Sequence, residues 1–232
     1  QISDLHIQQA GQHRELIQAE QHLGACVDQI NQLDTPPDLV AVTGDLTERG
    51  TPDEYRIVKQ HLDRLNAPYL VIPGNHDDRS NLRQAFADAD YLQTDSPFIQ
   101  YVVDRYPVRI IALDTTVPRR SEGELCTTRL QWLADTLAQA PDRATCILMH
   151  HPPFATGIRH MDELGLLRGR DAFEHIISPY RNIERILCGH LHRTIMCRVG
   201  SAMASTCPGT AHQIVLDLNS DSTALCFNFA RL

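Results

Sequence analysis

Short apolar runs in this chain repeatedly end in a small group of polar side chains, and this pattern limits the fold more than any other feature. The polar groups are, in chain order, Asp4 with His6, Asp45, Asn75 with His76, His150, and His190 with His192. Most runs before them are rich in valine, isoleucine and leucine without polar alternation, which is typical of central parallel strands covered on both faces. Ligands of open α/β sheets gather outside the carboxyl ends of the strands, so the pattern predicts an α/β fold in which these groups converge.

Helical patterns occupy the intervals between the predicted strands. Thr51-Pro52-Asp53-Glu54 combines an N-cap, a proline suited to the first helical position and a glutamate that can complete a capping box. The short connection between residues 98–103 and 108–113 predicts a hairpin, and therefore some antiparallel pairing. The predicted helices cover residues 14–33, 52–65 and 128–139, with a short helix from about Asp171, and further strands are predicted over 195–199 and 213–218.

Composition narrows the class of protein. The 232 residues, of which 42% are hydrophobic, suffice for one sizeable core, and we expect a single domain over residues 1–232. Because the first residue is Gln1 and not methionine, we expect the N-terminus, and part of the C-terminal region, to be missing. The formal charge of −8 argues against a nucleic-acid polymer as partner. Seven cysteines without a Cys-x-x-Cys pair, and no apolar run of the ~18 residues that a membrane span needs, predict a soluble cytoplasmic protein with free thiols.

Taken together, the polar groups predict a metal site. Each group alone is a weak signal, because Asp4-x-His6 also suits a surface loop and Gly74-Asn75-His76-Asp77 also suits a turn. Of the pair His150-His151, one histidine is expected to bind and the other to pack or to form a hydrogen bond. Two aspartates, one asparagine and four histidines are too many donors for one tetrahedral zinc, so we expect two ions that share a carboxylate. Mixed nitrogen and oxygen donors fit Zn, Fe, Mn or Co better than Ca.

Two metal ions indicate a hydrolytic reaction at phosphorus. Such a pair activates a bound water and stabilises the charge that builds on a phosphoryl group. The chain contains no glycine-rich phosphate loop and no serine or cysteine nucleophile motif. Attack by a metal-bound hydroxide is therefore the predicted mechanism.

The same motifs carry a family resemblance. Asp4-x-His6, Gly44-Asp45, Gly74-Asn75-His76-Asp77, His150-His151-Pro152-Pro153 and Gly189-His190-x-His192, in this order, resemble the calcineurin-like metallophosphoesterases. The segments 47–55 and 208–213 are similar to the bacterial class III branch, which includes 3′,5′-cyclic-nucleotide phosphodiesterases and glycerophosphodiesterases.

The resemblance implies a four-layer α/β/β/α sandwich with mixed sheets, and it implies a role for each ligand. One metal would be held by Asp4, His6 and His192, the other by Asn75, His150 and His190, and Asp45 would bridge the two.

The resemblance also implies residues that act on the substrate. His76 would lie outside the metal shell and donate a hydrogen bond to the phosphate or a proton to the leaving alkoxide, while Asp77 fixes its orientation. Asn75, His76 and His212 would contact the substrate, although a structural role for His212 is equally open.

The predicted activity is hydrolysis of a small phosphodiester, with 3′,5′-cyclic AMP as first candidate and a glycerophosphodiester as second. A phosphomonoesterase or phosphoprotein phosphatase, and a scaffold without catalysis, are the remaining alternatives. A scaffold should have lost ligands, whereas no ligand position departs from the family pattern. The tail after Leu218 has no assigned role, and a homodimer stays open.

Overall fold

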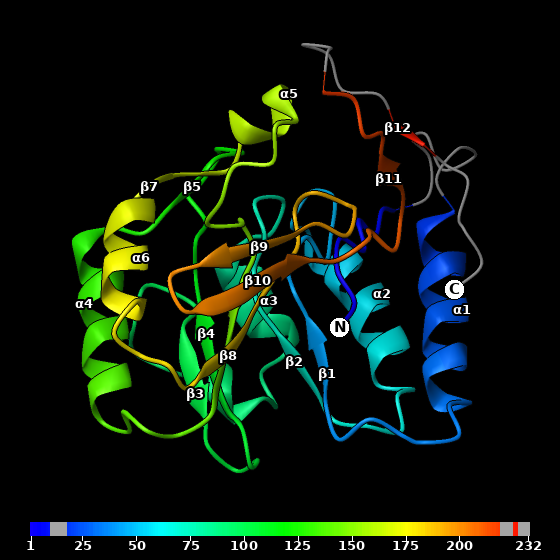
Figure 1. The fold of residues 1–232 in the computed structure, drawn as a ribbon. Helices are drawn as coiled ribbons and strands as arrows, with labels where there is room; N and C mark the ends of the chain where they lie inside the picture. Colours follow the sequence, from blue (N-terminus) through cyan, green and yellow to red (C-terminus); the bar gives the residue numbers. More distant parts are fainter. Residues whose placement is uncertain (10–17, 219–224, 227–232) are drawn as a thin grey trace.

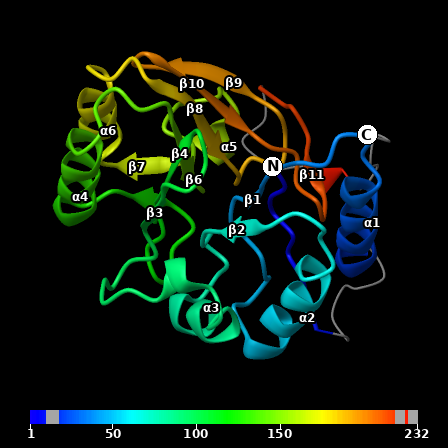
Figure 2. The ribbon, with the colours of Figure 1, turned by 90° about the horizontal axis from the view of Figure 1, so that it is seen from below.

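The computed structural model describes residues 1–9, 18–218 and 225–226. Two sheets lie face to face in the middle of the molecule, and helices cover their outer faces (Figures 1 and 2). Helices α1 (Ala19–Asn31), α2 (Pro52–Leu62) and α3 (Arg79–Ala85) lie on one side, and α4 (Thr127–Ala138) and α6 (Arg170–Ile177) lie on the other. This order of layers confirms the predicted α/β/β/α sandwich.

The larger sheet contains six strands in the order β3, β4, β6, β8, β10 and β9. They are β3 (Tyr101–Val103), β4 (Arg109–Leu113), β6 (Thr145–Met149), β8 (Ile183–Cys188), β9 (Met196–Val199) and β10 (Ala202–Thr206). β4, β6, β8 and β10 run parallel, while β3 and β9 are antiparallel edge strands. The pairing of β3 with β4 confirms the predicted hairpin, and the sheet is mixed as expected.

The smaller sheet pairs β1 (Val40–Val42) with β2 (Tyr69–Val71) in parallel. The N-terminal segment runs beside β1 and forms single parallel bridges from Ile2 to Val42 and from Ile7 to Thr47. Asp4 and His6 lie between these two bridges. The first polar group of the sequence is thereby placed beside Asp45, which follows β1.

Some segments differ from the prediction. β10 was not predicted because its sequence, Ala-Met-Ala-Ser-Thr, contains few residues that favour strands, and its pairing with β8 and β9 decides its conformation. The strand predicted over 213–218 is limited to β11 (Gln213–Ile214), which pairs with β12 (Leu225–Cys226), whereas Leu216 and Leu218 are exposed. Residues 14–17 of the first predicted helix lie outside the described residues. The remaining short elements are η1 (Asp90–Leu92), β5 (Gly123–Glu124), α5 (Arg159–Asp162) and β7 (Leu166–Arg168).

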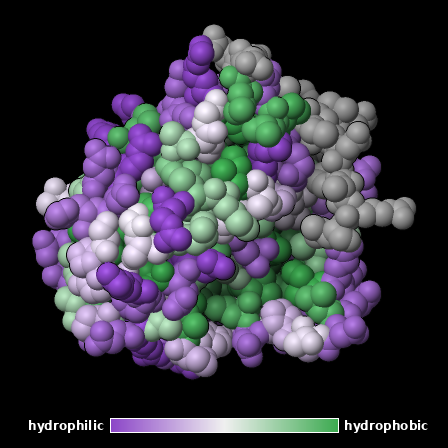
Figure 3. Space-filling view, viewed as in Figure 1, coloured by the Kyte–Doolittle hydropathy of each residue, from purple (hydrophilic) through white to green (hydrophobic). Residues whose placement is uncertain are grey.

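The six-stranded sheet separates two apolar clusters. Ile110 and Ala112 of β4 belong to the cluster shared with the smaller sheet, α1 and α2, whereas Ile111 and Leu113 belong to the cluster under α4 and α6. The division arises because successive side chains of a strand point to opposite faces. In Figure 3, which has the view of Figure 1, apolar side chains (green) line a hollow near the position of β1. Cover on both faces explains why the strands read as continuous apolar runs.

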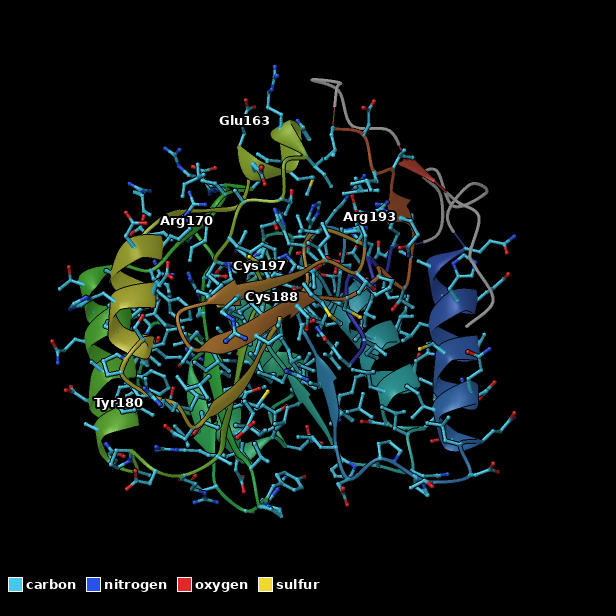
Figure 4. The ribbon with its side chains drawn as sticks, viewed as in Figure 1. Glu163, Arg170, Tyr180, Cys188, Arg193 and Cys197 are labelled. Atoms are coloured by element: carbon cyan, nitrogen blue, oxygen red, sulfur yellow. The ribbon has the colours of Figure 1, made fainter. Side chains whose placement is uncertain are left out.

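Two expectations about the environment of the chain can be compared with the structure. Among the described residues, no helix has the length and apolarity that crossing a bilayer requires. The six cysteines with described side chains are free thiols, as predicted. Figure 4 labels two of them, Cys188 on β8 and Cys197 on β9.

We expect Thr51→Ala to lower the free energy of unfolding by about 1 kcal/mol, because it removes the N-cap of α2. The Thr51 hydroxyl accepts a hydrogen bond from the Glu54 N–H, and the Glu54 carboxylate accepts one from the Thr51 N–H, which confirms the predicted capping box. Urea unfolding followed by circular dichroism measures the change. Thr51→Ser keeps the hydroxyl and is the control, so an equal loss in both variants would contradict the capping explanation.

Candidate metal centre

The seven predicted ligands lie together where the strands of both sheets end. Donor atoms of Asp4, His6, Asp45 and His192 lie within 4.8 Å of one another. The Asn75 Oδ1 atom lies 3.1 Å from both His150 Nε2 and His190 Nδ1. Two donor sets therefore stand side by side, and they are assembled from segments at both ends and in the middle of the chain.

Asp45 lies between the two donor sets. Its Oδ2 atom is 3.6 Å from His6 Nε2, in the first set, and 3.4 Å from His150 Nε2, in the second. Its Oδ1 atom accepts a hydrogen bond of 2.9 Å from the His76 N–H. A Cβ atom at Gly74 would collide with the Asp45 carboxylate, so this position requires glycine.

The backbone at the ligands is strained. Six non-glycine residues in the described ranges have φ in the left-handed region, and five of them are predicted ligands, namely Asp4, His6, Asp45, His190 and His192. Each such conformation costs on the order of 1–3 kcal/mol and persists where the surrounding structure imposes it. At Asp4 and His6 the left-handed φ values turn each side chain individually toward the centre.

The Gly189-His190-Leu191-His192 turn sends its two imidazoles to different donor sets. His192 Nε2 lies 3.3 Å from Asp4 Oδ1 and 3.2 Å from His6 Nε2, whereas His190 Nδ1 faces Asn75. The His190 N–H donates to Asp4 Oδ1 at 3.0 Å. Next in the chain, Arg193 (labelled in Figure 4) donates to the Ile214 carbonyl and ties the turn to β11.

Hydrogen bonds on the outer side orient three of the histidine ligands. The Nδ1 atoms of His150 and His192 donate to the carbonyls of Thr43 and His212 at 2.8 and 3.1 Å, and His6 Nδ1 lies 2.8 Å from the Glu48 carboxylate. A carbonyl only accepts, so in the neutral rings of His150 and His192 the lone pair is on Nε2. These lone pairs point to the centre, as second-layer partners of metal-binding histidines commonly arrange.

The donor set fits divalent cations. His192 Nε2 faces Asp4 Oδ1 at 3.3 Å, and His150 Nε2 faces the Asn75 amide oxygen at 3.1 Å. Both oxygens only accept, so each pair is favourable when a positive charge, carried by a proton on the ring or by a bound cation, lies between the two atoms. Imidazole nitrogens with carboxylate and amide oxygens are a suitable donor set for first-row divalent metals. The clusters therefore form a dinuclear divalent metal site.

The pKa shifts of the aspartates and histidines at the centre indicate a site that favours positive charge. Burial by itself would raise the pKa of Asp4, but the adjacent His192 outweighs it and lowers this pKa to about 2. Burial would lower the pKa of His150, but Asp45 outweighs it and raises this pKa to about 9. Burial, together with the neighbouring His150, lowers the pKa of His190 to about 3, which keeps that ring neutral. The carboxylates are thus ionised, and the centre attracts cations.

The His76 side chain lies beside the ligand His6, whereas the Asp77 side chain forms hydrogen bonds within the surrounding loops. The His76 ring lies beside the His6 ring, with centroids 4.8 Å apart, and its Nδ1 donates to the Glu48 carbonyl at 2.9 Å. Asp77 was predicted to orient this ring, and the hydrogen bonds correct that prediction. Its carboxylate accepts from the backbone N–H groups of Leu46, Thr47 and Gly74 and from the Tyr55 hydroxyl. Asp77 therefore joins the loop after β1 to the loop after β2.

Sequence reasoning left one role open and missed another. The His212 ring lies 4.3 Å from the His192 ring and its carbonyl holds His192 Nδ1, so His212 has the structural contact, while contact with substrate stays a prediction. Glu48 was missed, although its carboxylate contacts His6 and its carbonyl holds His76. The only signal was its position three residues after Asp45 at the end of a predicted strand.

We expect Asn75→Ala to weaken one metal site and to leave the other intact. The Asn75 side chain contacts His150 and His190, which both belong to the second donor set. Titration of the metal-free protein with Co²⁺, followed by absorption, measures the two affinities. Asn81→Ala, on α3, is a matched control because its amide donates to the Gly50 carbonyl and not to a ligand. Equal weakening of both sites in Asn75→Ala would contradict the assignment.

Comparison with known proteins supports this interpretation of the site. The family model described as calcineurin-like phosphoesterase matches residues 1–194. A probable glycerophosphodiester phosphodiesterase of Arcobacter nitrofigilis is 36% identical over 225 residues, which are 97% of this chain and 82% of that protein. A cAMP/cGMP dual specificity phosphodiesterase of Mycobacterium tuberculosis is 34% identical over 202 residues, which are 82% of this chain and 60% of that protein.

The fold has a counterpart among solved structures. A dimetal phosphatase from Danio rerio superposes with a TM-score of 0.70 at 16% identity, covering 90% of this chain and 86% of that chain. At this identity the likeness concerns the fold alone. Because the family model covers most of the chain and its relatives are phosphodiesterases, the chain belongs to the calcineurin-like phosphoesterase family and is a metal-dependent phosphodiester hydrolase.

Proposed function

We propose that this chain hydrolyses a small phosphodiester, with one divalent ion held by Asp4, His6 and His192 and a second held by Asn75, His150 and His190. The position of Asp45 carries the proposal, because its Oδ2 atom lies within 3.6 Å of His6 Nε2 and 3.4 Å of His150 Nε2 and can serve both sets. Two such ions, when bound, activate water and stabilise the charge that develops on a phosphoryl group. Mn, Fe, Zn and Co are the proposed ions, since all accept this mixture of nitrogen and oxygen donors.

His76 is the proposed proton donor to the leaving alkoxide. Since its Nδ1 donates to the Glu48 carbonyl, Nε2 is the atom left to face the substrate. Burial opposes protonation, but Asp45 and the Glu48 carbonyl outweigh it and raise the pKa of His76 above 6.5. A raised pKa favours the protonated ring near neutral pH, which is the state that a general acid needs.

Two substrates are candidates. Sequence reasoning placed 3′,5′-cyclic AMP before a glycerophosphodiester. Relatives with 36% and 33% identity are named glycerophosphodiester phosphodiesterases, and those named for cyclic nucleotides have 30–34% identity. We therefore place a glycerophosphodiester first and cyclic AMP second. Either is a small anion, and because the chain's net charge is −8, its phosphate would be met locally by the bound cations.

Side-by-side turnover tests the order of substrates. We expect the manganese-loaded protein to cleave glycerophosphoethanolamine with a higher kcat/KM than cyclic AMP. A clear preference for cyclic AMP would reverse the order and leave the reaction class intact. Cleavage of p-nitrophenyl phosphate but of neither diester would contradict the phosphodiesterase proposal and favour a monoesterase.

A cytoplasmic location completes the proposal. The six cysteines with described side chains are free, and thiols persist in reducing compartments. Fractionation of the producing cell measures the location directly.

A further inference from the structure

His151 is a buried histidine that the proposed reaction does not use. It follows His150 directly and its side chain is fully buried. Its Nδ1 lies 2.8 Å from Thr115 Oγ1, and its Nε2 lies 3.0 Å from the Ser121 carbonyl oxygen. A carbonyl only accepts, so Nε2 carries the hydrogen and the Thr115 hydroxyl donates to Nδ1. With both nitrogens engaged, the ring has no lone pair to offer a metal, although it lies among the ligands.

The His151 ring packs against two ligands. Its centroid lies 4.6 Å from that of His190 and 4.9 Å from that of His150. The two ligands differ in their other hydrogen bonds. The Nδ1 of His150 donates to the Thr43 carbonyl, whereas the Nε2 of His190 is buried and finds no hydrogen-bond partner in the described part of the chain. His190 Nδ1 faces Asn75, so on the other side of the His190 ring the contact described here is the packing of His151.

The loop behind His151 is itself held firmly. A Cβ atom added to Gly123 would lie 2.5 Å from His151 Cγ, so the ring fills the space above this glycine. Asp114, directly before Thr115, accepts hydrogen bonds of 2.6 and 3.0 Å from Arg79. Arg79 begins α3, just after the loop that carries Asn75. The loop that carries Asn75 and the loop that holds His151 are thus joined by one ion pair, in which Asp114 is buried and Arg79 is partly exposed.

We propose that His151 is a positioning residue for the ligand His190. Its ring, fixed by Thr115 and Ser121, keeps His190 Nδ1 directed at Asn75 Oδ1, 3.1 Å away, and so sets the affinity of the metal site formed by Asn75, His150 and His190. This inference rests on the two-metal function proposed above. Removal of a group that orients a metal ligand typically costs 10–100-fold in metal affinity.

Three variants disturb the His151 ring in different ways. Thr115→Val removes the hydrogen bond to Nδ1, Gly123→Ala pushes the ring from its place, and His151→Phe keeps a ring but removes both hydrogen bonds. Titration of the metal-free proteins with Co²⁺, followed by absorption, resolves the two binding steps. We expect each variant to weaken one step by about 10–100-fold and to leave the other unchanged, with the affected step matching that of Asn75→Ala.

Matched controls separate positioning from general damage. Thr145→Val removes a buried hydroxyl bond of 2.8 Å, to the Arg143 carbonyl, at the opposite end of β6. Gly165→Ala adds a methyl whose nearest neighbour would be 3.5 Å away. Both controls should keep both binding steps.

The outcomes distinguish this inference from the proposed function. If the parent protein binds two Co²⁺ ions and Thr115→Val and Gly123→Ala bind them with unchanged affinities, His151 is not a positioning residue, while the two-metal function stands. Equal weakening of both steps also overturns the inference. If the parent protein itself binds fewer than two ions, the proposed function fails and this inference fails with it. His151→Phe is not required for the decision, should it fail to fold.

Discussion

Asp45→Asn is expected to abolish tight binding of both metal ions and to slow turnover by roughly 10³-fold or more. The Oδ2 atom of Asp45 lies near both His6 and His150, at 3.6 and 3.4 Å. Asparagine has the same shape, so the hydrogen bond from the His76 N–H to Oδ1 can persist while the negative charge is lost. Metal-ion stabilisation of a phosphoryl transition state contributes several kcal/mol, and about 4 kcal/mol corresponds to roughly a 10³-fold change in rate.

Metal analysis and kinetics together measure this effect. Ions per chain after manganese loading, and kcat with a phosphodiester, are compared between the parent protein and the variant. Glu54→Gln is the control, because Glu54 is also a buried carboxylate but caps α2. Glu54→Gln should lose stability and keep both ions. Retention of both ions in Asp45→Asn would contradict a bridging role.

His76→Ala is expected to keep both metal ions and to lower kcat by ~10²–10⁴, the range for loss of a general acid. The His76 side chain is partly exposed at 35%, and its Nδ1 bonds to the Glu48 carbonyl, so the ring lies at the edge of the centre and not within it. The raised pKa of His76 makes it a donor near neutral pH. A substrate with a good leaving group, such as a p-nitrophenyl diester, should be affected least, because its leaving group needs no proton.

A control and a contrary outcome accompany this variant. His61→Ala removes a histidine of α2 that contacts Glu20 and should leave kcat unchanged. Loss of metal ions in His76→Ala would place His76 among the ligands, and an equal loss of rate for both kinds of leaving group would exclude its role as proton donor.

Much of the fold followed from local signals. The apolar runs before Asp45 and His150 predicted β1 and β6, and the capping box at Thr51 predicted the start of α2. These signals are local because strand burial and helix capping depend on residues a few positions apart. β10 gave no such signal, since its conformation depends on partners in β8 and β9.

The candidate site was predictable in its members but not in its geometry. The sequence named the candidate ligands because aspartate, asparagine and histidine repeatedly follow the strands. It gave no sign of the left-handed backbone at Asp4 and at His192. It also assigned Asp77 to His76, whereas the carbonyl of Glu48 holds that ring. The local sequence cannot predict such hydrogen-bond partners, because the carbonyl of any loop residue near the centre could accept the same hydrogen bond.

The sequence by itself determined which side chains are candidate metal ligands and at which strand ends they stand, since both are properties of short segments. Only the tertiary structure decided how they combine. The turn at residues 189–192 divides its histidines between two donor sets, because His190 contacts Asn75 whereas His192 contacts Asp4. Asp4 lies 188 residues before His192 in the chain. The contacts of His192 with the His212 carbonyl, of His150 with the Thr43 carbonyl and of His190 with the His151 ring join segments far apart in sequence. Long-range packing sets such contacts, and no local pattern encodes them.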